Sequence, residues 1–227
     1  MKDIGNRYEI SSLTNDKVKL INSLHHRKYR RQHNLFVAEG FRICREAAEN
    51  GWEIRYLLYD NLNIDTHIIE NLINEVLCLG ADVIGVTSEI LSKISHKENP
   101  QNVLCVIDQK WSNLPTIIKD KTFVALETVR DPGNLGTILR TMDGVGATDC
   151  ILLDECTDPF SYGSVRASMG AIFNVNIIAS SSEKFLKWKS RHKISLIGTS
   201  LINSKDYTKT NWQLPFVLAM GNEQQGL

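Results

Sequence analysis

Several common signatures are absent from this 227-residue sequence, and each absence excludes a class of protein. The first residues, MKDIGNRYEI, hold no apolar signal core, and no run is long and apolar enough to cross a bilayer. Charge of one sign is not in excess, because 26 Lys and Arg balance 26 Asp and Glu. This balance argues against a strongly basic nucleic-acid binder, although it leaves room for a local basic surface. We expect a cytoplasmic protein that does not enter a membrane.

Cysteine is scarce and forms no C-x-x-C pair. The five cysteines are odd in number and mostly stand in apolar runs (Cys44, Cys78, Cys105, Cys150 and Cys156). This pattern favours buried free thiols in a reducing compartment over disulfides or zinc. Three histidines lie close together in a basic segment, at positions 25, 26 and 33, which is a weak signal for a metal site. No bound metal is expected.

Two catalytic fingerprints are missing as well. The glycines of GNLG (133–136) do not form G-x-G-x-x-G, so a nucleotide-dependent α/β enzyme such as a dehydrogenase lacks its dinucleotide-binding motif. No G-x-S-x-G elbow surrounds Ser161, Ser164 or Ser168, which argues against a serine hydrolase.

What is present is an α/β pattern in two parts. Hydrophobic residues make up 42% of the chain, which is enough for a sizeable core. In the first part, apolar runs predict strands at 35–40, 54–60 and 102–108, with helices at 41–51, 66–74 and 88–95. Residues 109–121, with Pro115 and a polar cluster, predict a linker. We therefore expect domains at 1–108 and 122–227.

The second part predicts a parallel sheet covered by helices on both faces. Short runs rich in Val, Ile and Leu predict strands at 122–127, 149–154, 175–178, 194–198 and 216–220, with helices at 133–145, 161–173 and 183–192. In such sheets, ligands bind beyond the carboxyl ends of the strands. The loops that follow residues 127, 198 and 220 are therefore the candidate site.

These three loops carry polar residues whose meaning is open when each is taken alone. After 127, Asp131 and Pro132 suit a helix start, Asn134 lies at the helix entrance, and Arg140 lies about two turns on. Arg140 alone is more often a solvated charge. Thr199 and Ser200 suit an ordinary turn. The loop MGNEQQG suits a polar surface turn with one carboxylate, Glu223.

Residues 17–31, KVKLINSLHHRKYRR, hold six Lys or Arg and no acid. We expect a basic helix whose candidate RNA contacts are Arg27, Lys28, Arg30 and Arg31, with a solvated helix face as the alternative. Arg166, on a helix rich in Ser, Ala and Gly, is a further candidate phosphate contact, with a solvent-facing charge as its alternative.

Taken together, DPGNLGTILRT, YGSVRASMGAIF, GTSL and LAMGNEQQGL resemble the SpoU/TrmH-type RNA ribose 2′-O-methyltransferases of the SPOUT superfamily. The stretch 13–51 is similar to the substrate-binding domain that precedes the catalytic domain in many of these enzymes. The resemblance implies methyl transfer from S-adenosylmethionine to a ribose 2′-hydroxyl of ribosomal or transfer RNA, with an RNA-binding first domain. It also implies a trefoil knot and a homodimer formed through the C-terminal domain.

The resemblance also assigns site residues. It places Asn134 and Arg140 in the first motif, where we expect Arg140 to bind the developing alkoxide or a phosphate because arginine stays protonated. It assigns the cofactor pocket to Thr199, Ser200, Met220, Gly221 and Glu223, with Glu223 counted among the catalytic residues as well.

One departure from the family pattern concerns the third motif, which follows the glutamate loop and completes the cofactor pocket in the family. The sequence stops at Leu227, before this motif, so we expect a truncated domain rather than a lost motif. The main alternative function is a non-catalytic RNA-binding protein that retains the fold.

Overall fold

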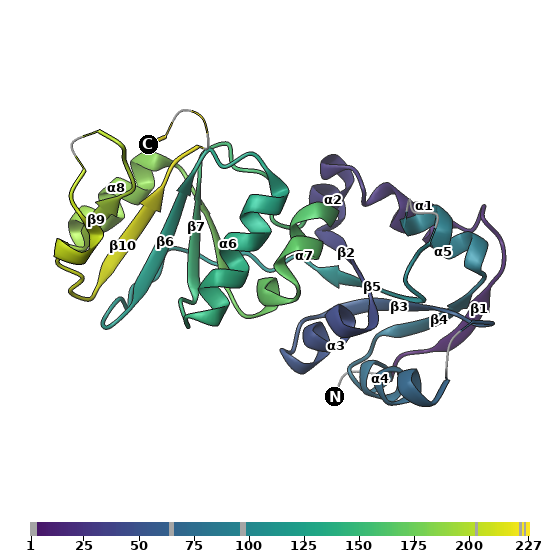
Figure 1. Ribbon diagram of the computed structural model, residues 1–227. Coiled ribbons are helices and arrows are strands. Elements are labelled where there is room, and N and C mark those ends of the chain that lie inside the picture. Colours follow the sequence, from purple (N-terminus) through teal and green to yellow (C-terminus); the bar gives the residue numbers. More distant parts are fainter. Residues whose placement is uncertain (1–3, 64–65, 96–98, 203, 223, 225) are drawn as a thin grey trace. The chain divides into compact units, whose positions relative to one another are not determined.

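The computed structural model describes residues 4–63, 66–95, 99–202, 204–222, 224 and 226–227, which fall into two compact units (Figure 1). Unit 1 comprises Met1–Gln109 and Phe160–Arg166, and unit 2 comprises Lys110–Pro159 and Ala167–Leu227. The sequence-based division assigned Phe160–Arg166 to the second domain. The contacts of this segment group it with unit 1 instead, whereas the predicted domain boundaries themselves remain a prediction.

Unit 1 is built on a mixed five-stranded sheet. Its strand order is β1 (Arg7–Ile10), β4 (Asp82–Val86), β3 (Ile54–Asp60), β5 (Val103–Asp108) and β2 (Leu35–Glu39). Strands β1, β4 and β3 pair in parallel, whereas β5 is antiparallel to both of its neighbours. Helices α1 (Asp16–Ser23) and α5 (Ser88–Ser95) pack on one face, and α3 (Phe41–Glu49) and α4 (Thr66–Cys78) cover the other (Figure 1).

Helix α4 is longer than predicted. The sequence predicts a helix that ends at residue 74. In the structure Ile69, Leu72, Ile73 and Val76 are all buried along one face, a spacing that continues the helix to Cys78. Cys78 is exposed, contrary to the expectation of a buried thiol, whereas the other four cysteines are buried and all five are free.

The basic segment forms two helices instead of one. Helix α1 ends at Ser23, and α2 spans Arg27–His33. The Arg30 guanidinium donates Nη1 hydrogen bonds to the carbonyls of Leu24 (2.8 Å) and His25 (2.7 Å). These carbonyls follow the end of α1, where helical partners are no longer available, so Arg30 fastens the junction between the two helices.

Unit 2 contains a five-stranded sheet in which every pair is parallel, as predicted. Its order is β8 (Asn176–Ser180), β7 (Asp149–Leu153), β6 (Thr122–Glu127), β10 (Phe216–Met220) and β9 (Ser195–Gly198). Helices α6 (Pro132–Gly144) and α8 (Ser182–Arg191) lie on opposite faces (Figure 1). Phe185 and Trp188 of α8 pack against Phe123 and Val217 of the sheet.

Two irregular segments lie between strands in the second half of the sequence. The helix expected over 161–173 ends early, since α7 spans Tyr162–Ser168 and η1 covers Ala171–Phe173. Gly170 between them has φ +100°, a left-handed conformation that ends the α-helix. A further 3-10 turn, η2, spans Tyr207–Lys209. Among the described residues, no helix is long and apolar enough to cross a membrane.

Candidate functional site

The strand order of unit 2 defines a switch point between β6 and β10. From β6 the chain proceeds outward through β7 and β8, and it then returns to the other side of β6 to form β9 and β10. Met220 lies opposite Leu126, and Ala219 lies opposite Gly198, so the carboxyl ends of β6, β10 and β9 are nearly level. The crevice at such a switch point is where open α/β sheets bind ligands.

A hydrogen bond joins two of the loops at this edge. The Asn222 side-chain amide Nδ2 donates to the carbonyl of Thr128 at 3.0 Å and so fastens the loop after β10 to the loop after β6. Thr128 has φ +52°, a conformation uncommon for a residue with a branched side chain. Asn222 had no predicted role, although the residue stands within the loop motif MGNEQQG.

The loop after β10 folds back upon itself. The backbones of Asn222 and Gly226 exchange two hydrogen bonds, of 3.0 and 2.9 Å. A Cβ placed on Gly221 would lie 2.1 Å from the carbonyl carbon of Gly226, and one on Gly198 would lie 2.9 Å from Cδ1 of Leu227. Glycine at these two positions therefore allows the chain to pass close to the ends of β9 and β10.

The loop after β9 supplies Thr199 and Ser200, both exposed. The Thr199 amide donates to the carbonyl of Ala219 at 3.0 Å, which continues the pairing of β9 with β10 by one residue. The Ser200 hydroxyl accepts from the amide of Ile202 at 3.1 Å and closes a local turn. Leu201 and Ile202, which follow, are exposed, so the rim of the site carries apolar side chains beside polar backbone.

Helix α6 begins directly after the Thr128 loop. Asp131 caps it, since Oδ1 accepts from the amide of Asn134 at 2.7 Å, and Pro132 occupies its first turn. Asn134 and Arg140 are both exposed. Six residues separate them, which corresponds to about 9 Å along the helix axis. The structure thus places Asn134 at the switch point and Arg140 further along the same helix.

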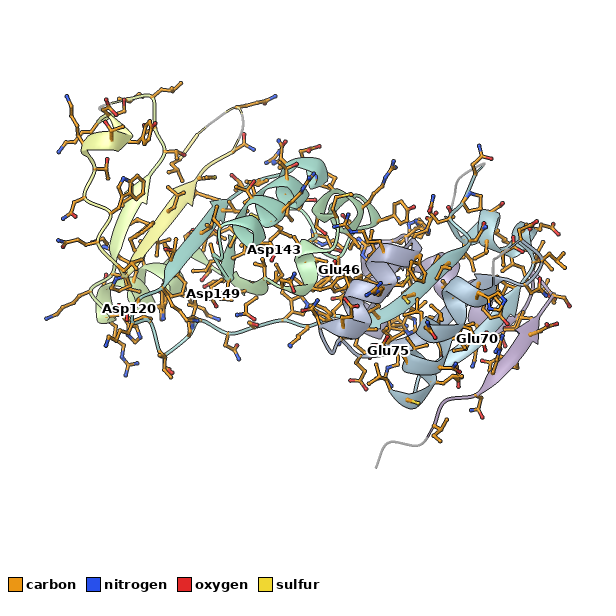
Figure 2. All side chains as sticks on the ribbon, turned by 60° about the horizontal axis from the view of Figure 1, so that its bottom comes forward. Glu46, Glu70, Glu75, Asp120, Asp143 and Asp149 are labelled. Carbon is orange, nitrogen blue, oxygen red and sulfur yellow. The ribbon has the colours of Figure 1, made fainter. Side chains whose placement is uncertain are left out.

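Charged side chains also pair at the opposite, amino-terminal end of the strands. Figure 2 shows Asp120 and Asp149 at the amino-terminal end of the strands. Buried Asp149 accepts from Lys121 Nζ at 2.9 Å and from Asn176 Nδ2 at 3.2 Å. A hollow of about 230 Å³ lies there, lined by residues 120–122 and 145–148. Because ligands bind parallel sheets at the carboxyl end, this hollow is not the candidate site.

The cations predicted to bind RNA differ in accessibility. Arg27, Lys28 and Arg31 of α2 are exposed, and so is Arg166 of α7. Arg30 is only 4% exposed and is held by two carbonyls, so its guanidinium does not lie on the exposed surface of α2 as predicted. Figure 2 shows acidic side chains, Glu46, Glu70 and Glu75, on helices α3 and α4 of the same unit.

The predicted site is therefore assembled from three loops and one helix. Thr199, Ser200, Met220 and Gly221 lie at the carboxyl ends of the adjacent strands β9 and β10. Asn134 lies in the first turn of α6, the helix that follows the loop after β6. Glu223, expected in both the catalytic and the cofactor-binding set, lies outside the described residues.

Comparison with known protein families matches both halves of the chain. Residues 121–227 match the SpoU rRNA Methylase family, and residues 15–105 match the MRM3-like substrate binding domain. The chain is 27% identical over 219 residues to the 23S rRNA (guanosine(2553)-2′-O)-methyltransferase RlmP of Bacillus subtilis. That alignment covers 96% of this chain and 84% of RlmP.

Solved structures give the same result. An S-adenosylmethionine-bound rRNA methyltransferase from Sinorhizobium meliloti shares 39% identity with a TM-score of 0.90, over 98% of this chain and 84% of that one. The SpoU methyltransferase AviRb from Streptomyces viridochromogenes, in complex with the same cofactor, shares 26% identity with a TM-score of 0.85, over 94% of this chain and 83% of that one.

Proposed function

The chain belongs to the SpoU rRNA methylase family, and on that premise we propose that it transfers a methyl group from S-adenosylmethionine to a ribose 2′-hydroxyl of ribosomal RNA. The observation that supports this function best is the set of three loops at the switch point of the parallel sheet. The Asn222–Thr128 hydrogen bond joins two of these loops. The alternative, an RNA-binding protein without catalysis, predicts the same fold without a working cofactor site.

The residues at this edge fit S-adenosylmethionine. Gly198 and Gly221 allow residues 226 and 227 to pack against the strand ends, and exposed apolar side chains at 201, 202 and 227 suit an adenosine moiety. Thr199, Ser200, Met220 and Gly221 would hold the cofactor, chiefly through their backbone. When bound, the cofactor supplies an electrophilic sulfonium methyl group.

The contribution of the protein to transfer is to position and stabilise the attacking oxygen. A guanidinium group remains charged at any working pH, so Arg140 acts as a fixed positive charge rather than as a base. It stabilises negative charge that develops on the 2′-oxygen or holds an adjacent phosphate. Asn134, one and a half turns earlier, orients the ribose or Arg140.

RNA is the proposed macromolecular partner, and unit 1 is its main binding surface. The exposed cations of α2, namely Arg27, Lys28 and Arg31, would contact phosphates. Helix α4 carries Glu70 and Glu75 and no Lys or Arg, which makes it an unfavourable surface for RNA. We further propose a homodimer formed through unit 2 and a knotted carboxyl-terminal segment, both of which rest on the family resemblance, and a cytoplasmic location, which rests on the sequence pattern alone.

Two measurements test this function. Calorimetry with S-adenosylmethionine should show one site per chain, and the full chain should transfer labelled methyl groups to an unmodified 23S rRNA transcript. The Arg140→Ala variant should lose transfer and retain cofactor binding, whereas Arg191→Ala, an exposed arginine of α8, should retain both. Absence of both cofactor binding and methyl transfer, with RNA binding retained, would support the non-catalytic alternative.

A further inference from the structure

The segment Phe160–Arg166 contributes its first aromatic ring to the core of unit 1. Phe160 is fully buried, with its ring centroid 4.9 Å from that of Phe36 and 6.3 Å from that of Trp52. The Phe36 and Trp52 rings are themselves 6.0 Å apart. Three mutually packed rings hold this end of the segment, because aromatic pairs at such separations contribute beyond the area that they bury.

A partly buried hydrogen bond fixes the next turn of the segment. The Tyr162 hydroxyl donates to Oε2 of Glu39, whose other oxygen, Oε1, accepts from the amide of Gln101 at 2.8 Å. Burial, and then the hydrogen bond with Glu39, raise the pKa of Tyr162, so that the hydroxyl keeps its proton and remains a donor. The Tyr162 ring also lies 5.6 Å from the ring of His25, next to the start of α2.

Arg166 stands one helical turn after Tyr162. Ser161 starts the helix, since its hydroxyl accepts from the amide of Ser164 at 3.2 Å and its carbonyl accepts from the amide of Val165 at 3.0 Å. Residues four apart lie on the same side of a helix, and the charge of Arg166 is close enough to act on the Tyr162 hydroxyl. The Arg166 side chain is exposed. Unit 1 therefore determines the direction in which Arg166 points.

We propose that Tyr162 is a positioning residue, which Glu39 holds so that Arg166 is presented to RNA by the same unit that carries the cations of α2. This inference rests on the proposed function, because it specifies how RNA is held for methyl transfer. A purely structural role of the Tyr162–Glu39 pair would change stability and leave RNA affinity per folded molecule unaltered. The coupling between Tyr162 and Arg166 separates the two cases.

A double-mutant cycle on the full chain measures this coupling. Wild type, Tyr162→Phe, Arg166→Ala and the double variant are compared for the KM of a 23S rRNA transcript and for the Kd of S-adenosylmethionine. We expect Tyr162→Phe to raise the KM for RNA about tenfold, a typical effect of one lost hydrogen bond. The Kd of the cofactor should not change, and Arg166→Ala should have little additional effect once Tyr162 is Phe. Additive effects, or an unchanged KM, would overturn the proposal.

Two controls make each outcome decisive. Tyr56→Phe, at a half-buried tyrosine of the same unit, should leave the KM for RNA unchanged. If Tyr162→Phe fails to fold, Glu39→Gln replaces it in the cycle, since this change keeps the side-chain size and weakens only the acceptor. Fluorescence anisotropy with labelled RNA runs in parallel and tests the coupling even if no transfer occurs. Absence of transfer by the wild type would count against the proposed function, and absence of coupling would count against the role of Tyr162.

Discussion

The side chain of Asn222 donates a hydrogen bond to the main-chain carbonyl of Thr128, a residue 94 positions earlier in the sequence. Thr128 leads into helix α6, which carries Asn134 and Arg140, and Asn222 follows strand β10. This single contact joins the loop that leads to the proposed catalytic helix with the loop that would line the cofactor.

Replacing Asn222 with Ala should therefore weaken cofactor binding more than it weakens folding. The hydrogen bond is only partly buried, and such a bond contributes about 0.5–1.5 kcal/mol, which corresponds to a change of roughly two- to tenfold in affinity. Calorimetry with S-adenosylmethionine and a thermal melt measure the two effects. Gln224→Ala, an exposed neighbour in the same loop, is the matched control. Equal affinities for Asn222→Ala and wild type would show that the loops hold their positions without this bond.

Gly136 allows helix α6 to approach the end of α7 closely. A Cβ at this position would lie 2.4 Å from the Ala167 Cβ and 2.7 Å from the Ser168 amide nitrogen. Gly136→Ala should therefore lower the free energy of unfolding by about 1–3 kcal/mol, as overpacking does elsewhere. Gly144→Ala in the same helix meets nothing within 4 Å and should be neutral or slightly stabilising. Urea denaturation of both variants makes the comparison. Equal free energies of unfolding would show that α7 shifts to accommodate the added methyl group without loss of stability.

The exposed cations of α2 should set part of the salt dependence of RNA binding. Each phosphate contact contributes about 0.7–0.9 to the slope of log K against log salt, so reversing Arg27, Lys28 and Arg31 together should flatten the slope by roughly two units. Anisotropy titrations between about 50 and 200 mM salt, a range in which such effects are large, measure this slope. Reversal of Lys184, Lys187 and Arg191 on α8, all of which are exposed, provides a control with the same change of charge. An unchanged slope would exclude α2 from the RNA interface.

Arg30 should behave differently from its neighbours. Arg30→Ala leaves the carbonyls of Leu24 and His25 without their donor and should destabilise unit 1 by about 1–3 kcal/mol. The folded fraction should keep the salt slope of the wild type. A flattened slope with unaltered stability would restore Arg30 to the RNA-binding surface.

Acid should destabilise the protein through Asp60 and Asp82 of unit 1. Burial alone would raise the pKa of each carboxyl. Hydrogen bonds outweigh this effect: Asp60 accepts them from Ser88 and backbone amides, and Asp82 accepts them from Lys17 and Asn6. Both pKa values therefore lie below the ordinary 3.8. A lowered pKa in the folded state contributes stability above the ordinary pKa, and this contribution is lost as the pH falls through the folded value. The free energy of unfolding should therefore fall below about pH 4.

Urea denaturation from pH 7 to pH 3 checks this expectation. Asp60→Asn and Asp82→Asn should each be less stable than wild type at pH 7 and should show a smaller decline in acid. Asp16→Asn, at a carboxylate whose side chain is 99% exposed, is the control and should keep the wild-type profile. A decline that is the same in all variants would locate the acid sensitivity elsewhere.

The predictions from sequence succeeded where the signal was local. Apolar runs and helix-start residues identified the parallel sheet of unit 2 and its loops, because burial on both faces leaves a pattern within a few residues. The placement of Phe160–Arg166 in unit 1 was missed, since Tyr162 meets Glu39 across 123 residues and no local pattern encodes that partner. The burial of Arg30 was missed for a related reason, because a guanidinium turned toward backbone carbonyls has the same sequence signature as a solvated one.

Strand β10 lies between β6 and β9, in the interior of its sheet, yet it follows all the other described strands in the sequence. As the chain leaves the ribosome, β6 and β9 therefore lack the strand that pairs with both of them until residues 216–220 have emerged. The core of unit 1 is also incomplete until Phe160 has been made, because Phe36 and Trp52 lack its ring. Each unit therefore depends on a segment that is made after the rest of its core, and chaperones that shield unpaired strands and exposed rings would have most to protect in that interval.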